Sequence, residues 1–147
     1  MDHKIKINIG SDHNGYKLKS FLIEYLKSKK YSVNDFGTNS DSVSVDYPDY
    51  ANYVCESILS DYEVDYGILI CGTGIGMSIA ANRYSKIRAA LCLNLDMARL
   101  ARQHNNANIL VLGAKILNEQ DAVNILEKFL STSFEGGRHS VRVDKLG

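Results

Sequence analysis

The sequence contains little of what marks several special classes of protein. Its 147 residues include no tryptophan, one proline and three cysteines. Cys55, Cys71 and Cys92 form no C-x-x-C pair, which excludes a zinc ribbon or a disulfide framework and favours a reducing compartment. No apolar run reaches the roughly 18 residues that a membrane span needs. The first residues also lack the apolar segment of a signal peptide, so we expect a cytoplasmic protein.

The chain has no excess of charge of either sign. Lys plus Arg and Asp plus Glu number 17 each, so the formal net charge is zero. Domains that bind nucleic acid or acidic membranes are usually basic, so we expect neither partner. An apolar content of 45% is ordinary for a globular protein. We expect a single domain spanning residues 1–147, because this length suits one core.

What the sequence does contain is a regular alternation of strand and helix patterns. Short apolar segments at 4–10, 31–37, 66–72, 88–94 and 107–113 predict five strands, and apolar residues at helical spacing follow them. The alternation predicts an α/β, three-layer Rossmann-like fold, with a five-stranded parallel sheet and helices on both faces. For the strand order we assume 2-1-3-4-5. Ligands bind such sheets at the carboxyl ends of the strands, where the loops after strands 1 and 3 would share a crevice.

The third predicted strand ends in the motif "CGTGIGMS". Here Cys71 is followed by glycines at alternate positions, Gly72, Gly74 and Gly76. A dinucleotide loop, G-x-G-x-x-G/A, needs a small third residue, and Met77 or Ile79 stands there in the two possible frames. The glycines still allow backbone amides to approach a small anion, although a tight turn without a ligand is the alternative. Cys71 can serve as a thiolate base or simply as a small core residue.

Two further pairs of polar residues stand at expected element ends. Asp12 and His13 follow the first strand in "GSDHNG", where Asp12 or Asn14 can also be a helix N-cap. Arg138 and Arg142 are four residues apart. On a helix they would share a face and could grip a phosphate, but an extended segment would separate them, and two solvated side chains are the alternative.

His104 and Asn105 lie in "LARQHNNAN", at the end of the helix expected after the fourth strand. Met97, Leu100, Ala101 and His104 recur at helical spacing, so His104 is either a buried, satisfied histidine or a functional one. Asn105 and the asparagine after it suit a helix exit, where a left-handed residue is often needed.

Taken together, these segments resemble the type B ribose-5-phosphate isomerases, within the sugar-phosphate isomerases that include allose- and galactose-6-phosphate isomerases. The motifs that carry the resemblance are "GSDHNGYKLK", "DFGT", "DYPDYA", "ILICGTGIGMSIAANR", "IRAALC", "RQHNNANIL" and "EGGRHSVRV". The resemblance implies a Rossmann-like fold, no cofactor and no metal. It also implies a homodimer or dimer of dimers with a site shared between subunits, which the C-terminal segment 134–147 would reach.

The resemblance also assigns roles to individual residues. Cys71 matches the base that moves a proton between C1 and C2 of the open-chain sugar, and Thr73 matches a hydroxyl that shuttles protons nearby. Asp12 and His104 match residues that assist ring opening. The backbone hole for the enediolate oxygens matches three glycines: Gly72, Gly74 and Gly76.

The binding residues follow in the same way. Tyr47 and Asn105 match substrate contacts, whereas His13, Arg138 and Arg142 match the phosphate end of the site. The two arginines, like the catalytic histidine, would come from the partner subunit. One departure is a lysine at position 115, where many members carry an arginine. Lysine keeps the charge but loses the bidentate fork.

The reaction implied is the interconversion of ribose 5-phosphate and ribulose 5-phosphate through a cis-enediol(ate), in the pentose phosphate pathway. One branch of the family replaces the cysteine with a later glutamate, but Cys71 is present here, with Met77 and Ser78 in the matching later segment. The alternatives are an isomerase of a six-carbon sugar phosphate such as allose 6-phosphate, a nucleotide-binding or sensory module, and a purely structural dimer.

Overall fold

The structure, a computed structural model, describes residues 4–147. Strands and helices alternate along the chain, as the sequence predicts. The strands are β1 (Lys6–Ser11), β2 (Ser32–Asp35), β3 (Tyr66–Cys71), β4 (Ala89–Leu91) and β5 (Ile109–Gly113). A 3₁₀ turn, η1 (His13–Gly15), precedes the first of six helices, which are α1 (Tyr16–Ser28), α2 (Tyr47–Ser60), α3 (Ile75–Ala81), α4 (Leu95–Asn105), α5 (Glu119–Ser131) and α6 (Arg138–Asp144).

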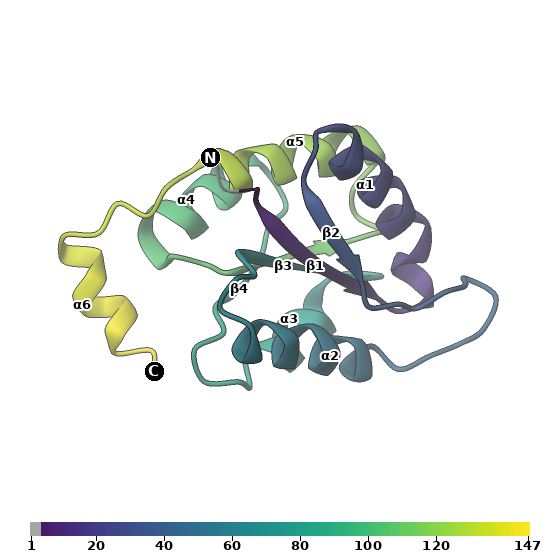
Figure 1. Cartoon of the computed structure of the whole chain (residues 1–147), viewed down its shortest axis with the longest axis horizontal. Helices are drawn as coiled ribbons and strands as arrows, with labels where there is room; N and C mark the ends of the chain where they lie inside the picture. The colour runs from purple at the N-terminus through teal and green to yellow at the C-terminus, as the bar shows by residue number, and fades with distance from the viewer. Residues whose placement is uncertain (1–3) are drawn as a thin grey trace.

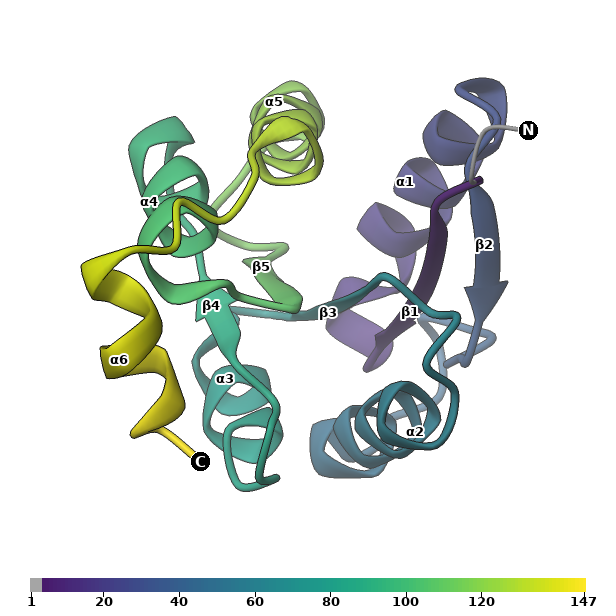
Figure 2. The same cartoon turned by 60° about the vertical axis from the view of Figure 1, so that its left-hand side comes forward.

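The strands form one parallel sheet between two layers of helices. Helices α1, α4 and α5 cover one face, and α2 and α3 cover the other (Figures 1 and 2). The predicted α/β class and the five parallel strands are therefore confirmed. The predicted adjacency of β1 and β3 is also correct, because Gly10 pairs with Leu69 and Ser11 with Ile70. The loops after these two strands consequently open at the same edge of the sheet.

The predicted strand order was wrong at one end of the sheet. The observed order is β2-β1-β3-β5-β4, so β5 lies inside and β4 at the edge. All five residues of β5, "ILVLG", are buried, whereas the three residues of β4 are only partly buried. Burying the longer apolar strand removes more apolar surface from water, and a very short edge strand offers little backbone to unwanted pairing.

The core has two halves, one on each face of the sheet. On the first face, Phe129 of α5 and Leu22 of α1 are fully buried against β1 and β3. On the second face, Val54 of α2 and Met77 of α3 are fully buried against β3 and β5. Strand β3 contributes to both halves, with Ile68 and Ile70 on one face and Leu69 and Cys71 on the other. The loop that follows β3 is therefore anchored in the best-packed part of the molecule.

Helix ends agree with the sequence, but one helix face does not. Pro48 occupies the first turn of α2, and Asn106 closes α4 in a left-handed conformation with φ 48°. The buried face of α4, however, is Ala98, Ala101 and Arg102, and Met97 is exposed. The expected stripe of Met97, Leu100, Ala101 and His104 is thus correct at Ala101 and wrong at Met97, while Leu100 and His104 are only partly buried. In the part of the chain that the structure describes, no helix is long and apolar enough to cross a membrane.

Candidate active site

A cavity of about 480 Å³ opens at the carboxyl edge of the sheet. Six of the predicted site residues line it, namely Asp12, Tyr47, Cys71, Gly72, Thr73 and Gly76. The other lining residues are Asn14, Ile75, Ile79 and Lys115. The cavity therefore combines a thiol, a carboxylate, two hydroxyl groups and an ammonium group at the crevice between β1 and β3.

Cys71 is the last residue of β3 and stands at the floor of this cavity. Its Sγ accepts a hydrogen bond from the backbone N–H of Gly74 at 3.2 Å. The other two cysteines lie within the core, where burial raises the pKa of Cys55 and of Cys92 to about 12. Only the thiol of Cys71 combines a hydrogen-bond donor with a place at a cavity.

The loop after Cys71 can take its path only with glycine at certain positions. Gly74 has φ +80°, and a Cβ there would lie 2.5 Å from Cδ1 of Leu91. A Cβ at Gly76 would lie 2.6 Å from Cε1 of Tyr47, so the tyrosine ring rests directly on the backbone of α3. Thr73 accepts a hydrogen bond on Oγ1 from the N–H of Ile75 at 3.2 Å. The hydroxyl proton of Thr73 is then available for another acceptor.

The segment after β1 provides a buried carboxylate and a fixed imidazole. Asp12 is buried, and its Oδ1 accepts a hydrogen bond from the N–H of Gly15 at 3.1 Å. It therefore caps η1, as the alternative interpretation expected, and it also reaches the cavity. His13 accepts on Nδ1 from the N–H of Val45 at 3.1 Å, which ties the loop before α2 to this site and fixes the ring orientation. Its Nε2 remains as the other ring position for a ligand.

The remaining predicted residues lie at the opposite edge of the sheet. Helix α4 runs back between the carboxyl end of β4 and the amino end of β5, so His104 and Asn105 lie far from the cavity edge (Figures 1 and 2). Arg138 and Arg142 are both on α6, which packs on α4. In the described chain, residues 4–147, none of these four lines the cavity. One chain thus carries two separated groups of predicted site residues.

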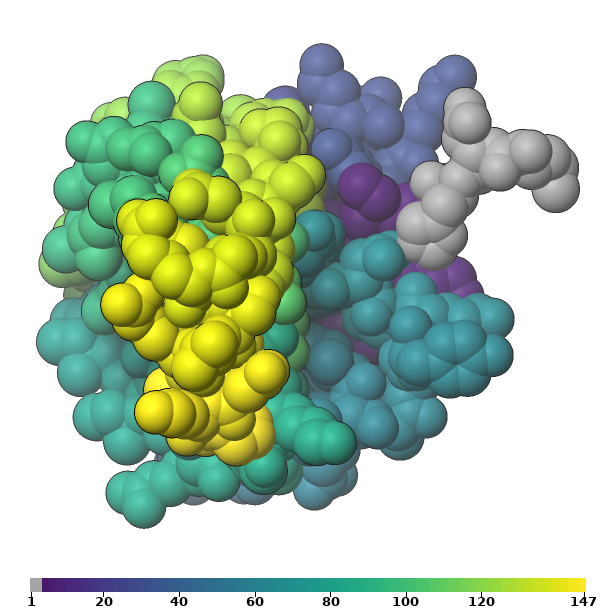
Figure 3. Space-filling view, turned by 90° about the vertical axis from the view of Figure 1, so that its left-hand side faces the viewer, coloured from purple at the N-terminus to yellow at the C-terminus, as the bar shows by residue number. Residues whose placement is uncertain are grey.

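The sequence left open whether the segment that carries Arg138 and Arg142 is helical or extended, and the structure answers this question. Residues 138–144 are helical, so Arg138 and Arg142 are one turn apart and both exposed. The space-filling view shows α6 as an outer strip on the surface of the molecule (Figure 3). The two guanidinium groups can therefore reach a molecule outside this chain.

Two polar lining residues, Asn14 and Lys115, are not among the site residues expected from the sequence. The sequence suggests Asn14 only as a helix cap and Lys115 only as a departure from an arginine. A Cβ at Gly72 would lie 3.5 Å from Cδ of Lys115 and 3.7 Å from Nδ2 of Asn14, so both side chains cover the start of the glycine loop. The signal for Asn14 was its place beside Asp12 and His13 at a strand end.

Comparisons with known proteins agree on one family. The family model described as Ribose/Galactose Isomerase matches residues 7–146. A ribose-5-phosphate isomerase B of Escherichia coli is 43% identical over 141 residues, covering 96% of this chain and 93% of that protein.

Solved structures give the same result. The crystal structure of a ribose 5-phosphate isomerase from Thermotoga maritima superposes with a TM-score of 0.95 at 58% identity, covering 98% of both chains. That of a ribose-5-phosphate isomerase B from Mycoplasma genitalium with bound ribulose-5-phosphate has a TM-score of 0.93 at 42% identity, covering 99% of this chain and 95% of that one. The chain belongs to the ribose/galactose isomerase family.

Proposed function

We propose that the protein interconverts ribose 5-phosphate and ribulose 5-phosphate, with Cys71 as the base. The observation that carries this proposal is that Cys71 lines one cavity together with Asp12 and Thr73. The sulfur of Cys71 also accepts a hydrogen bond from a backbone N–H of the glycine loop. The relatives support the same substrate, since one is a ribose-5-phosphate isomerase B with bound ribulose-5-phosphate. The failed dinucleotide fingerprint weighs against a nucleotide-binding module.

The chemistry requires one proton to move between adjacent carbons. The thiolate of Cys71 removes the proton from C2 of the open-chain aldose, the C–H electrons form the C1=C2 bond, and the carbonyl electrons move to O1. The hydroxyl proton on O2 passes to O1, with Thr73 as the carrier, and the thiol returns its proton to C1 to give the ketose. General acid–base catalysis of this kind contributes about 10²–10⁴-fold.

The glycine loop has the task of stabilising the enediolate. Negative charge develops on O1 and O2 during proton removal, and backbone amides that already point at this position stabilise it without reorganisation. We assign this role to the loop Gly72–Gly76, because its backbone is held by the tight packing of Gly74 and by Tyr47 on Gly76. Tyr47 also closes one side of the cavity and is placed to contact the sugar.

A second copy of the chain would complete the site. His104, Asn105, Arg138 and Arg142 cannot join the cavity of their own chain, because they lie at the other edge of its sheet. In a homodimer, or a dimer of dimers, the segment 134–147 of one chain would bring the arginines to the phosphate and His104 to the ring oxygen of the partner's substrate. Exposed apolar side chains support this arrangement, with Ile75 and Ile79 at the rim of the cavity and Val141 on α6.

The proposal is tested by replacing the base. Cys71→Ala and Cys71→Ser should each lower kcat for ribose 5-phosphate by about 10²–10⁴-fold, with little change in KM, because the thiolate acts on the reacting carbon. The matched control is Cys92→Ala, which removes a buried thiol away from the cavity and should leave kcat within about two-fold. A Cys71 variant that keeps most of the wild-type kcat contradicts the proposal. The six-carbon alternative is tested by comparing kcat/KM for allose 6-phosphate with kcat/KM for ribose 5-phosphate.

A further inference from the structure

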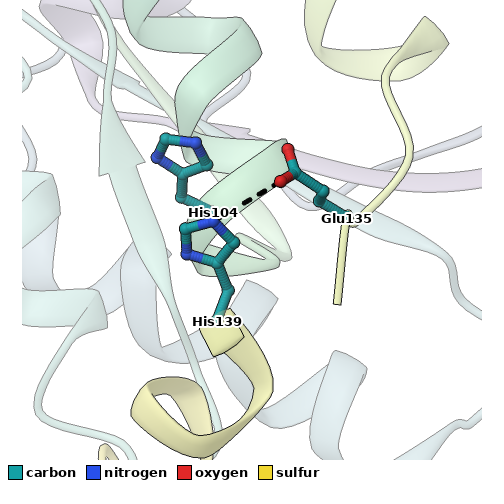
Figure 4. A group of neighbouring side chains, drawn as sticks. All are labelled: His104, Glu135 and His139. Atoms are coloured by element: carbon teal, nitrogen blue, oxygen red, sulfur yellow. Dashed lines mark ion pairs between the residues drawn. The ribbon is translucent and has the colours of Figure 1, made fainter. Parts of the chain in front are cut away.

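Three ionisable side chains gather where α4 meets the segment leading to α6. The rings of His104 and His139 are stacked, with centroids 4.2 Å apart and planes only 13° from parallel. Glu135 approaches the pair from the side, with Oε1 3.7 Å from Nε2 of His139 (Figure 4). The cluster therefore places one partly exposed imidazole on a buried one.

Backbone and side-chain hydrogen bonds hold this cluster in place. The N–H of Glu135 donates to the carbonyl of Gln103 at 3.0 Å, in the residue before His104. Arg102 is buried and donates through Nε to the carbonyl of Thr132 at 3.1 Å. The end of α4 and the start of the C-terminal segment are thus joined by two hydrogen bonds between residues that precede the stacked histidines.

The geometry argues against a metal site at this cluster. Ligand atoms of His104, Glu135 and His139 lie within 4.8 Å of one another, so the residue types alone would suit zinc. However, an imidazole binds a metal along a lone pair that lies in the plane of its ring. The lone pairs of two stacked rings lie in two nearly parallel planes, one above the other, and therefore do not converge on one point.

Packing alone does not explain why residue 139 is a histidine. Its side chain is nine-tenths buried, and among the described residues 4–147 its Nε2 has no hydrogen-bond partner. A buried polar atom that makes no hydrogen bond is unfavourable, and an aliphatic side chain would fill the same space without it. The ring contributes what an aliphatic residue lacks, which is a flat aromatic face on which His104 lies.

We propose that His139 is a positioning residue, whose ring holds the imidazole of His104 in the orientation needed to open the sugar ring. This inference rests on the proposed function, in which His104 acts on the ring oxygen of the partner's substrate. Without the stack, the side chain of His104 at the end of α4 would sample other rotamers. A misplacement of about 1 Å at a reacting group can cost about 10²-fold in rate.

The charges around the stack favour this role. Burial lowers the pKa of His139, and the neighbouring His104, Arg138 and Arg142 lower it further, against the opposing effect of Glu135. His139 is therefore uncharged at neutral pH. The stacked neighbour therefore adds no positive charge beside His104 and does not oppose the role of His104 at the ring oxygen.

The first test distinguishes the contribution of the flat aromatic ring of His139 from the contribution of its volume. His139→Ala and His139→Leu both remove the ring, and the leucine keeps the volume, so both should lower kcat for ribose 5-phosphate by about 10- to 100-fold with KM changed less than about three-fold. His139→Phe restores a flat ring and should return kcat to within about three-fold of wild type. Thermal unfolding of each variant shows whether it is folded.

The second test uses a substrate that has no ring to open. An aldotetrose 4-phosphate lacks the free hydroxyl that would close a five-membered ring, yet it presents the same aldehyde and adjacent carbon. If His139 acts through ring opening, His139→Leu should slow the tetrose by less than about three-fold while slowing ribose 5-phosphate about ten-fold or more. If the wild type does not turn over the tetrose, the ribose 5-phosphate comparison of the leucine and phenylalanine variants decides.

Two results would overturn the inference. One is an equal loss of kcat in the leucine and phenylalanine variants. The other is a rise in KM with kcat unchanged, which would mean that His139 only docks α6 and its arginines. Both results leave the wild-type isomerase activity intact, so they are distinct from failure of the proposed function, in which the wild type itself would not isomerise ribose 5-phosphate.

Discussion

The loop after β3 and the helix α6 are the two regions that carry the proposed chemistry, and they are built in opposite ways. The loop continues from a strand whose residues are buried on both faces, and Gly74 is packed against Leu91 and Leu112. Helix α6 is a short outer element that packs on α4, and Arg138, Val141 and Arg142 on it are exposed. The reacting end of the substrate would meet a rigid surface, whereas the phosphate would meet side chains that a partner brings.

This difference has a physical reason. Proton transfer depends on the position of the base to within a fraction of an ångström, so a buried strand end suits it. A phosphate is bound through charge, which acts over longer distances and tolerates movement of the arginine side chains. The two regions should therefore respond differently to the same kind of substitution.

The largest difference between the two regions is expected when a glycine with positive φ is replaced by alanine in each of them. In Gly74→Ala the new Cβ would lie 2.5 Å from Leu91, so strain and overpacking add, and the free energy of unfolding should fall by about 2–5 kcal/mol with loss of activity. Gly137→Ala, just before α6, has φ +58° but no atom within 4 Å of the new Cβ. Strain alone should cost about 1–3 kcal/mol there. Chemical denaturation measures both, and equal losses would contradict the contrast between the regions.

The arginines of α6 should affect binding and leave stability unchanged. Arg138→Ala removes a charged hydrogen-bond donor worth about 1.5–3 kcal/mol, so KM for ribose 5-phosphate should rise by about 10- to 150-fold while kcat and the melting temperature stay close to wild type. Lys145→Ala, an exposed cation after the same helix, is the control and should have little effect on KM. An Arg138 variant with unchanged KM would remove α6 from the phosphate site.

The shared site predicts that two chains, each impaired at low substrate for a different reason, can restore each other's activity. In a hybrid of Cys71→Ala and Arg138→Ala chains, one of the two sites combines an intact Cys71 with an intact Arg138. Random exchange of equal amounts makes half of the dimers hybrid, so about one quarter of the wild-type activity should return at low substrate. No recovery after exchange that native mass spectrometry confirms would contradict a site built from two chains.

The buried cysteines should respond to alkaline pH. Burial raises the pKa of Cys92 from 9.0 to about 12, so the folded state keeps the proton that the unfolded chain loses. The contribution of Cys92 to stability is therefore complete below pH 9 and is lost as pH rises from about 9 to about 12. Urea denaturation of Cys92→Ala should show a smaller decrease over this range than wild type. Cys71→Ser is the control, and an identical decrease in wild type and Cys92→Ala would contradict the prediction.

The smallest effect is expected at Lys115, a cation that lines the cavity beside the glycine loop and could also contact the phosphate of the substrate. Lys115→Arg introduces a planar fork that can hold a phosphate through two hydrogen bonds. We expect a gain of about 1 kcal/mol, or roughly a five-fold lower KM, with kcat unchanged. Lys115→Met, which keeps the length without the charge, should raise KM. A fall in kcat in the arginine variant would instead place Lys115 near the reacting carbons.

Much of the fold could be predicted because it depends on local patterns. The alternation of apolar strands and amphipathic helices indicated parallel βα units, and the Gly-rich loop at the end of "YGILIC" indicated where the site opens. The position of β4 could not be predicted in the same way. Its neighbours in sequence suggested an inner place, but the fully buried β5 competes for that place and wins.

The candidate site was predictable in kind but not in arrangement. The residue types of Asp12, His13 and Cys71 at strand ends indicated acid–base chemistry at one edge, and the family resemblance added Thr73. The stacking of His104 on His139 could not be predicted, because the two residues are brought together by the path of a connection after α5 that has no periodic pattern. The buried face of α4 was misassigned for a related reason: Arg102 is buried by its hydrogen bonds to Thr132, Asn106 and Ala107, which apolar spacing does not reveal.

The sequence by itself determined the strands and helices, the parallel sheet, and the glycine loop with Cys71 at its start, because these features depend on the periodicity and conformational limits of neighbouring residues. The tertiary structure alone decided that β5 lies inside β4, and that the ring of His104 stacks on that of His139. Both depend on how much surface distant segments of the chain bury against each other. No local sequence pattern encodes that quantity.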